Sequence, residues 1–387
     1  MKKYLLPTAF LLASLSVSAQ QDLFALTGKD VNTISFKDFR ALDLKKGISG
    51  AEIFSVNSDA KVYSVARKGM VTEEKTSFNN SQTPNMATLA YNSFDNTLVY
   101  MPMFSSNIYI LNPDTKEMKL VENSVVLNKS CDINSHITRM TTGYDGNIYA
   151  INNAGTQFIK IANKNGNYIV SDLGIIKDDA SNGKNSFTEM LSGFGGDMVA
   201  DSDNNFYVFA ASGNVFKVSV NDLTAKFLGK IQGLPDGYSV NGSAVNADNK
   251  VVIATAKGLS LFEVDMETLQ ANALNNDIKL PIYDLASKYF LNEKINATVL
   301  AGADIYPTRV TEQYFNVSIK NKALKGILRV DVFDMGGKKV YSQNISSKLG
   351  VVEDRVQMNG LIEGAYIVAV SDESGKNILN KKILVTH

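Results

Sequence analysis

The chain has 387 residues, of which 44% are hydrophobic, and its 39 Lys and Arg residues balance 39 Asp and Glu residues. This length suits two domains rather than one, and the apolar fraction is sufficient to build a core in each. A formal net charge of zero provides no overall field that would attract nucleic acid or anionic lipid, so nucleic-acid binding is disfavoured. Cys131 is the only cysteine, which excludes an intramolecular disulfide framework.

Residues 1–19 have the pattern of a secretory signal peptide. Lys2 and Lys3 precede a mostly apolar stretch that ends near Val17, and the small residues before Gln20 match the positions that a signal peptidase reads. The apolar run is too short and too interrupted for a stable membrane span, although an N-terminal anchor is the alternative interpretation. We therefore expect export into the periplasm and no transmembrane segment in the mature chain.

Residues 20–291 read as one domain built from a repeated unit. The unit is clearest from Ala87 to Val121, where four short β-type runs are separated by turn residues. The same order of runs and turns returns near Ile137, near Asp197 and near Asn241. Between the second and third copies lies a polar insertion, Lys177 to Asn185, for which we expect a loop on one face of the domain.

The first hairpin turn of each copy carries Asp followed by Asn or Gly. These residue types tolerate left-handed backbone angles, and the pairs are Asp95-Asn96, Asp145-Gly146, Asp203-Asn204 and Asp248-Asn249. Their positions are 50, 58 and 45 residues apart. Units of about 40–50 residues with four strands each are typical of β-propeller blades. An open β-sandwich array or a β-solenoid is the alternative.

The two ends of this domain look incomplete. Phe39 to Lys45 resembles the turn between the third and fourth strands of a unit, and Ile282 to Leu291 resembles early strands with no later ones. The two ends are expected to complete one blade together, which removes free sheet edges. Ala51 to Phe78 reads as a further, degenerate blade. The sequence therefore predicts six blades, with five as the second choice.

After a linker at residues 292–302, residues 303–387 follow a different pattern. Short alternating runs such as Leu328 to Asp334 and Ala365 to Val370 are separated by glycine-containing turns. About seven short strands in some 80 residues describe a small Ig-like β-sandwich. The predicted fold class is thus all-β, a propeller followed by a sandwich.

This C-terminal segment contains several motifs in a fixed order. It begins with Tyr-Pro, continues with a strand that ends in Asp before Gly-Lys, then a Leu-x-x-Gly-x-Tyr stretch, and it ends in a strand with a Lys pair. The residues are Tyr306, Pro307, Asp334, Gly337, Lys338, Leu361, Gly364, Tyr366, Lys381 and Lys382. The segment resembles the type A C-terminal sorting domain of the type IX secretion system of Bacteroidetes. It departs from that family at Thr308-Arg309, where the family usually has Asn-Pro.

The resemblance implies a route for the whole chain. The signal peptide would deliver it to the periplasm, and the type IX machinery in the outer membrane would recognise the C-terminal domain. That domain would then be removed, with the body released or attached to the cell surface. A generic Ig-like module is the alternative for this domain.

Residues for catalysis are scarce. The only histidines are His136 and His387, and no Gly-x-Ser-x-Gly motif is present. Cys131 precedes His136 by five residues, but this offset fixes no catalytic geometry, and a buried thiol beside a loop histidine is the simpler expectation. With so few Cys and His residues, a zinc site is not indicated.

Calcium is the metal that the sequence leaves open. Asp201, Asp203 and Asn205 begin like a calcium-binding loop, but Phe206 replaces the usual glycine and no closing glutamate follows at Ser212. A polar hairpin turn is therefore the favoured interpretation. We expect no cofactor, with calcium as the one possibility.

We expect the exported body to be a secreted or cell-surface binding module for an unknown protein or glycan. Its contacts would lie on loops such as Lys177–Phe187 and Leu234–Val240. One alternative is a calcium-dependent hydrolase or lactonase-like propeller, in which acidic residues converge in the central channel; candidates by residue type are Asp145, Asp201, Asp248 and Glu189. The other is a structural partner of the secretion or gliding apparatus.

Overall fold

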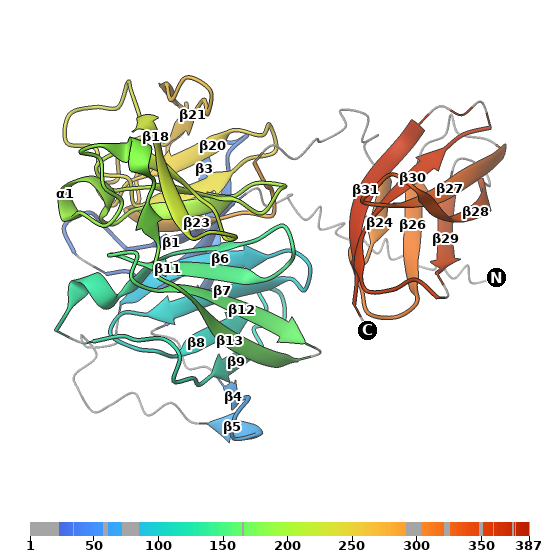
Figure 1. Cartoon of the computed structure of the whole chain (residues 1–387), viewed down its shortest axis with the longest axis horizontal. Helices are drawn as coiled ribbons and strands as arrows, with labels where there is room; N and C mark the ends of the chain where they lie inside the picture. Colours follow the sequence, from blue (N-terminus) through green and yellow to red (C-terminus); the bar gives the residue numbers. More distant parts are fainter. Residues whose placement is uncertain are drawn as a thin grey trace, which may run out of the picture.

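The structure is a computed structural model with two separate β-domains (Figure 1). It describes residues 23–33, 35–56, 61–71, 85–129, 131–164, 166–291, 303–320, 326–347, 351–358, 360–373, 375 and 377–386. The predicted signal peptide and the predicted linker at 292–302 lie outside these residues. Among the helices described, none has the length and apolarity needed to cross a membrane.

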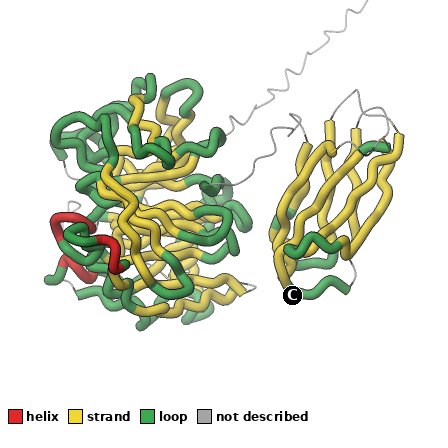
Figure 2. The backbone as a smooth tube through the Cα atoms, turned by 45° about the horizontal axis from the view of Figure 1, so that its top comes forward, coloured by secondary structure: helices red, strands yellow, loops and turns green. Residues whose placement is uncertain are grey.

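The N-terminal body contains five sheets, each dominated by consecutive antiparallel strands (Figure 2). The first comprises β1 (Leu23–Thr27), β2 (Asp38–Asp43), β3 (Ile48–Ser55) and β23 (Ile282–Ala286). The second comprises β6 (Met86–Asn92), β7 (Thr97–Pro102), β8 (Ile108–Leu111) and β9 (Met118–Val121), with β4 (Val62–Ser64) and β5 (Gly69–Val71) added at its edge.

The remaining three sheets follow the same plan. The third comprises β10 (Ile137–Thr142), β11 (Ile148–Asn152), β12 (Phe158–Lys164) and β13 (Asn167–Gly174). The fourth comprises β15 (Asp197–Ala200), β16 (Phe206–Phe209), β17 (Asn214–Val218) and β18 (Thr224–Lys230), with β14 (Lys177–Asp178) at its edge. The fifth comprises β19 (Gly242–Val245), β20 (Val251–Ala254), β21 (Phe262–Val264) and β22 (Ala271–Ala273).

The innermost strands of the five sheets form a closed ring. β6 lies beside β10, β10 beside β15, β15 beside β19, β19 beside β23, and β23 beside β6. The described residues therefore form a five-bladed propeller, and the preference for six blades was wrong. The error arose at Ala51–Phe78: β3 is the outer strand of the first blade, and the hairpin of β4 and β5 extends the second, with β4 parallel to β9.

The predicted closure of the ring is confirmed. β23, from the end of the propeller sequence, pairs with β1 from its beginning, with Phe24 opposite Ala286 and Leu26 opposite Asp284. One blade is thus built from both ends of the domain. The pairing of β1 with β23 leaves neither strand with an unpaired edge where the two ends of the domain meet.

The repeated turns adopt the backbone conformation that their residue types predict. The second residue of each Asp-Asn or Asp-Gly pair has a positive φ: 51° at Asn96, 78° at Gly146, 64° at Asn204 and 60° at Asn249. Asn and Gly are the residues that accept this left-handed region most readily. The turn chemistry therefore sets the position of the first hairpin in four of the five blades.

The insertion at Lys177–Asn185 is more ordered than a simple loop. Its first two residues form β14, parallel to β18, and Ala180–Asn182 form a short 3-10 helix. The four-residue helix α1 (Met190–Gly193) follows before β15. Figure 2 shows the helical segments in red on one side of the body.

The C-terminal domain is a β-sandwich. One sheet comprises β24 (Ala303–Tyr306), β26 (Tyr314–Lys320) and β29 (Val351–Gln357). The other comprises β25 (Arg309–Val310), β27 (Gly326–Asp334), β28 (Lys339–Ser347), β30 (Gly364–Ser371) and β31 (Asn377–Val385). Alternating apolar residues from the two sheets, including Phe315, Val330 and Val368, form its core.

Candidate functional site

Each innermost strand of the propeller contributes one fully buried polar residue among its first three positions. We call these five residues the inner-strand cluster: Thr88 on β6, Arg139 on β10, Asp197 on β15, Ser243 on β19 and Asp284 on β23. Buried charges are costly unless they are paired and hydrogen-bonded. The cluster is therefore the most demanding electrostatic feature of the body.

The two carboxyl groups of the cluster are tied to backbone N–H groups of other blades. The Ser243 N–H donates to Asp197 Oδ2 at 2.6 Å, and the Leu89 N–H donates to Asp284 Oδ2 at 3.1 Å. Burial raises the pKa of Asp197 to about 8, and burial together with the charge of Asp197 raises the pKa of Asp284 well above its usual range. These two acids therefore do not behave as ordinary ionised carboxylates.

Arg139 holds the chain segment that precedes β15. Its guanidinium donates to the carbonyls of Gly195 at 3.0 Å, Asn152 at 3.4 Å and Gly193, and it lies 5.1 Å from the centre of the Phe187 ring. Burial lowers its pKa to about 9, while the charge of Asp197 opposes that shift. Arg139 thus fixes the loop that carries α1.

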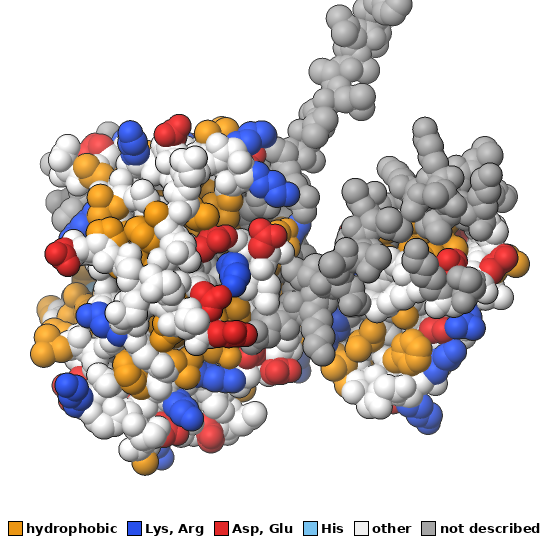
Figure 3. Space-filling model, turned by 90° about the horizontal axis from the view of Figure 1, so that it is seen from above, with side chains coloured by type: hydrophobic (Ala, Val, Ile, Leu, Met, Phe, Trp, Pro, Cys, Tyr) orange, Lys and Arg blue, Asp and Glu red, His pale blue; other side chains and the backbone are white. Residues whose placement is uncertain are grey.

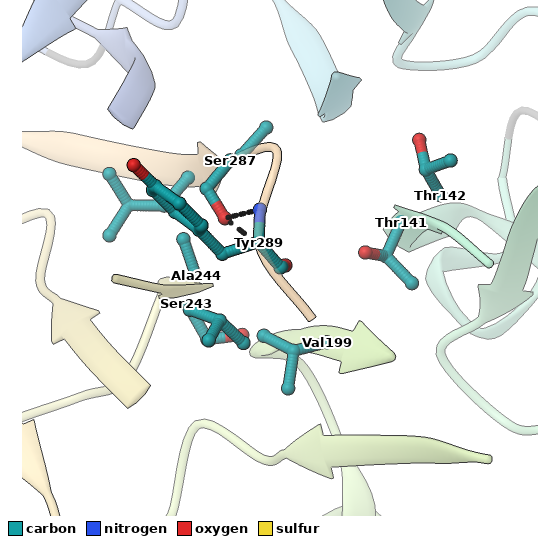
Figure 4. A pocket seen from close by; sticks show the side chains of 10 residues that line it. Thr141, Thr142, Val199, Ser243, Ala244, Ser287 and Tyr289 are labelled. Atoms are coloured by element: carbon teal, nitrogen blue, oxygen red, sulfur yellow. Dashed lines mark hydrogen bonds between the residues drawn. The ribbon is translucent and has the colours of Figure 1, made fainter. Parts of the chain in front are cut away.

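A small cavity lies beside this cluster. A cavity of about 10 Å³, room for a single water molecule, is lined by innermost-strand residues and by the segment after β23 (Figure 4). The residues Thr141, Thr142, Ser243, Ser287 and Tyr289 are among its lining, and Ser287 Oγ accepts a hydrogen bond from the Tyr289 N–H. A cavity of this size does not accommodate an organic substrate.

The acidic residues proposed for a channel enzyme do not lie together. Asp145, Asp201 and Asp248 lie in the first hairpin turns of three different blades, whereas Glu189 precedes α1 at the opposite end of the strands. Within the described part of the chain, no group of three or more His, Cys, Asp or Glu side chains is arranged to hold a metal ion.

The suggested calcium loop is occupied by its own hydrogen bonds. Asp201 Oδ1 accepts the N–H groups of Asp203 and Asn205, and Oδ2 accepts from the Asn205 side chain and the Tyr207 hydroxyl. This is the pattern of a polar turn. At the Cys-His pair the expectation of a buried thiol was wrong, because Cys131 is exposed. The expectation of a loop histidine is confirmed, since His136 lies between the 3-10 helix Ile133–Ser135 and β10, where it is buried.

One face of the propeller carries exposed apolar side chains. The loops that join second to third strands, and one blade to the next, all lie at the same end of the antiparallel sheets. Eight large apolar residues on these loops are between 42% and 92% exposed: Val31, Phe104, Leu127, Ile133, Ile175, Met190, Leu191 and Leu259. We call this the loop face. The two loops predicted from sequence also lie here, but their Phe187, Tyr238 and Val240 are buried.

The sorting-motif residues of the C-terminal domain have clear structural positions. Asp334 Oδ1 accepts the N–H groups of Gly336 and Lys338, each at 2.9 Å, and Gly337 between them has a φ of 80°. The motif Asp-x-x-Gly-Lys is therefore a tight turn between β27 and β28, in which the Asp side chain and the left-handed glycine are both required.

The other motif residues link strands or fill the core. Tyr366 is buried and donates to the Ile362 carbonyl at 2.9 Å, and Leu361 packs against the same core, close to Gly364 at the start of β30. Tyr306, before Pro307, is half exposed. Lys381 pairs with Asp304 on β24, and the Lys382 ammonium lies 3.5 Å from the centre of the Tyr144 ring.

Residues 304–386 match the family described as the secretion system C-terminal sorting domain. The resemblance drawn from the motifs is thereby confirmed, and the C-terminal domain is a sorting domain of this kind. The match marks the chain as a cargo of type IX secretion, exported to the cell surface or beyond it. No curated protein sequence matches the chain.

Three solved structures are among those that match this chain. The extracellular domain of BT4673 from B. thetaiotaomicron is 10% identical, over 90% of this chain and 48% of that one, with a TM-score of 0.32. PorZ, a surface component of the type-IX secretion system of Porphyromonas gingivalis, is 12% identical, over 94% and 51%, with a TM-score of 0.30. A chain of the nidogen/laminin complex is 10% identical, over 70% and 98%, with a TM-score of 0.39. The present chain spans about half the length of the first two.

Proposed function

We propose that the propeller body is a non-catalytic binding module, which the sorting domain delivers to the outer surface of the cell. The observation that carries this proposal is the loop face, on which eight large apolar side chains are exposed. Scattered exposed apolar residues are ordinary, but their collection on one set of loops is typical of a protein-binding surface.

The distribution of charge supports a protein partner. Figure 3 shows Lys and Arg side chains interspersed with Asp and Glu on the body, in agreement with a net charge of zero. A surface of this kind has no field to attract a polyanion. The chain also has no tryptophan, which disfavours an extended stacking platform for sugars.

The interior of the propeller supports the same conclusion. The cavity beside the inner-strand cluster holds about one water molecule, and the carboxylate of Asp201 is engaged by its own turn. Recognition therefore falls to the exterior loops rather than to the channel.

Site-specific photocrosslinking tests this proposal. In the full-length protein, a photoreactive amino acid replaces Leu191 on the loop face. The matched control carries the same amino acid in place of Ile169 on the outer strand β13. Both variants are exported by a type IX-competent host. Leu191 is 92% and Ile169 45% exposed. A discrete crosslinked species at position 191, absent at position 169 and lost in Met190→Asp, is the expected result.

Two other outcomes would change the interpretation. Equal crosslinking at both positions, or none at either, would contradict a binding role for the loop face. A partner that fractionates with the outer membrane would favour the structural role in the secretion or gliding apparatus over recognition by a released protein.

A further inference from the structure

The strand that closes the propeller ring carries one of the two buried acids. Asp284 lies in the middle of β23, and its Oδ2 accepts the Leu89 N–H of the second blade. Asp197, on the innermost strand of the fourth blade, interacts with Asp284 and accepts the Ser243 N–H of the fifth. The two carboxyl groups therefore connect β23 to three other innermost strands.

The charges around this pair do not balance if both acids are ionised. From β10 the pair faces the cation of Arg139, which interacts with Asp197. From β6 and β19 it faces Thr88 and Ser243, which carry no charge. One guanidinium compensates one carboxylate, so a second ionised carboxylate would be buried without a counter-charge. A single retained proton restores neutrality.

The hydrogen bonds indicate which acid holds the proton. Asp197 accepts backbone N–H groups from Met198 at 2.7 Å, from Ser243 at 2.6 Å and from Leu285. Donors on both of its oxygens favour the ionised form. Asp284 Oδ1, in contrast, is fully buried and accepts no well-aligned hydrogen bond from the residues that the structure describes. A proton on this oxygen would give it one, by donation to Asp197.

We infer that one proton, held on Asp284 Oδ1 and donated to the Asp197 carboxylate, locks the closing strand β23 into the propeller ring. Loss of that proton to solvent would leave two facing carboxylates and only one compensating cation, Arg139. The ring closure is therefore sensitive to pH, and it is firmest when the proton is retained.

The direction of the pH dependence follows from linkage. The two acids titrate as a pair. Burial and their mutual charge raise the pKa at which the pair gives up its last proton, whereas in an opened ring both acids ionise near their ordinary value. The folded state then binds more protons than the opened state, so closure weakens as pH rises from about 4 to the raised pKa of the pair. One proton of difference corresponds to about a tenfold rise in the opening constant per pH unit.

Hydrogen exchange of the β23 and β1 amides in the full-length protein tests this inference. After correction for intrinsic exchange, the opening constant of the wild type should rise about tenfold per pH unit across this window. Asp284→Asn, whose amide donates as the protonated acid does, should abolish the slope and keep the ring closed. Asp197→Asn should open the ring at every pH. The side-chain NH2 group of the asparagine would replace one carboxylate oxygen and would then face a backbone N–H donor instead of accepting from it. A wild-type slope that persists in Asp284→Asn would overturn the inference.

A second measurement does not depend on the folding of a variant. Infrared spectroscopy of the wild-type protein at pH 7, where ordinary carboxyl groups are ionised, should retain a protonated-carboxyl band that disappears at higher pH. Absence of that band at pH 7 would also overturn the inference.

Discussion

Replacement of Arg139 by Met removes the cation of the inner-strand cluster while keeping most of the side-chain volume. Three carbonyl groups, those of Gly193, Gly195 and Asn152, lose their donor, and Asp197 loses its counter-charge. Removing one partner of a buried charged pair costs about 3–5 kcal/mol. The burial that lowers the pKa of Arg139 to about 9 offsets part of its contribution in the wild type, which favours the lower half of this range.

This cost is large enough to measure by calorimetry. A domain of 150–250 residues loses about 2–4 °C in Tm per kcal/mol, so Arg139→Met should lower the melting transition of the propeller by about 10 °C. The transition of the sorting domain should remain in place, because Arg139 contributes nothing to its core. Crosslinking at Leu191 should also decrease, since Arg139 anchors the loop that carries α1.

Arg67→Met is the matched control. Arg67 is an exposed residue paired with Glu122, and exposed ion pairs contribute about 0–1 kcal/mol. A loss in Arg139→Met no greater than in Arg67→Met would refute the view that the buried guanidinium stabilises the ring.

Three further predictions concern single turns and sites. Gly146→Ala should destabilise the propeller by about 1–2 kcal/mol in urea titration. The φ of 78° there strains a residue with a Cβ, while the added Cβ itself meets no close contact, so backbone strain is the whole cost. Gly146→Asn should cost less, as Asn occupies the equivalent turn position in three other blades. Tyr366→Phe removes the hydrogen bond to Ile362, and a loss of about 1 kcal/mol should lower the sorting-domain Tm by about 4–8 °C with the propeller transition unchanged. Calcium chelation should leave both transitions in place, since protein donors occupy the Asp201 carboxylate; a fall in Tm that calcium restores would contradict this assignment.

The parts of the fold that could be predicted from sequence depend on local chemistry. The Asp-Asn and Asp-Gly pairs identified the first hairpins because Asn96, Gly146 and their equivalents must adopt positive φ. The incomplete repeats at the two ends identified the ring closure, although β1 was missed because it follows the predicted signal peptide as a short apolar run. The sorting domain was recognised from turn and core residues that its sandwich requires.

The errors concern pairings between distant segments. Strand-like runs in Ala51–Phe78 suggested a blade, but sequence does not say that β4 pairs in parallel with β9 at the edge of another sheet. The inner-strand cluster was missed for a similar reason, because a charged residue in a strand usually faces solvent. The available signal was weak: Asp197 and Asp284 each stand beside apolar residues in a short strand, whereas Arg139 stands among threonines.

The central claim is that the C-terminal domain directs the propeller out of the cell, and export with and without residues 303–387 tests it most directly. Both forms would be produced in a type IX-competent host, and the location and mass of each would be measured. We predict that the full chain appears outside the cell, shortened at both ends, while the truncated form stays in the periplasm. Equal export of the truncated form would contradict the account and leave the C-terminal sandwich without a sorting role.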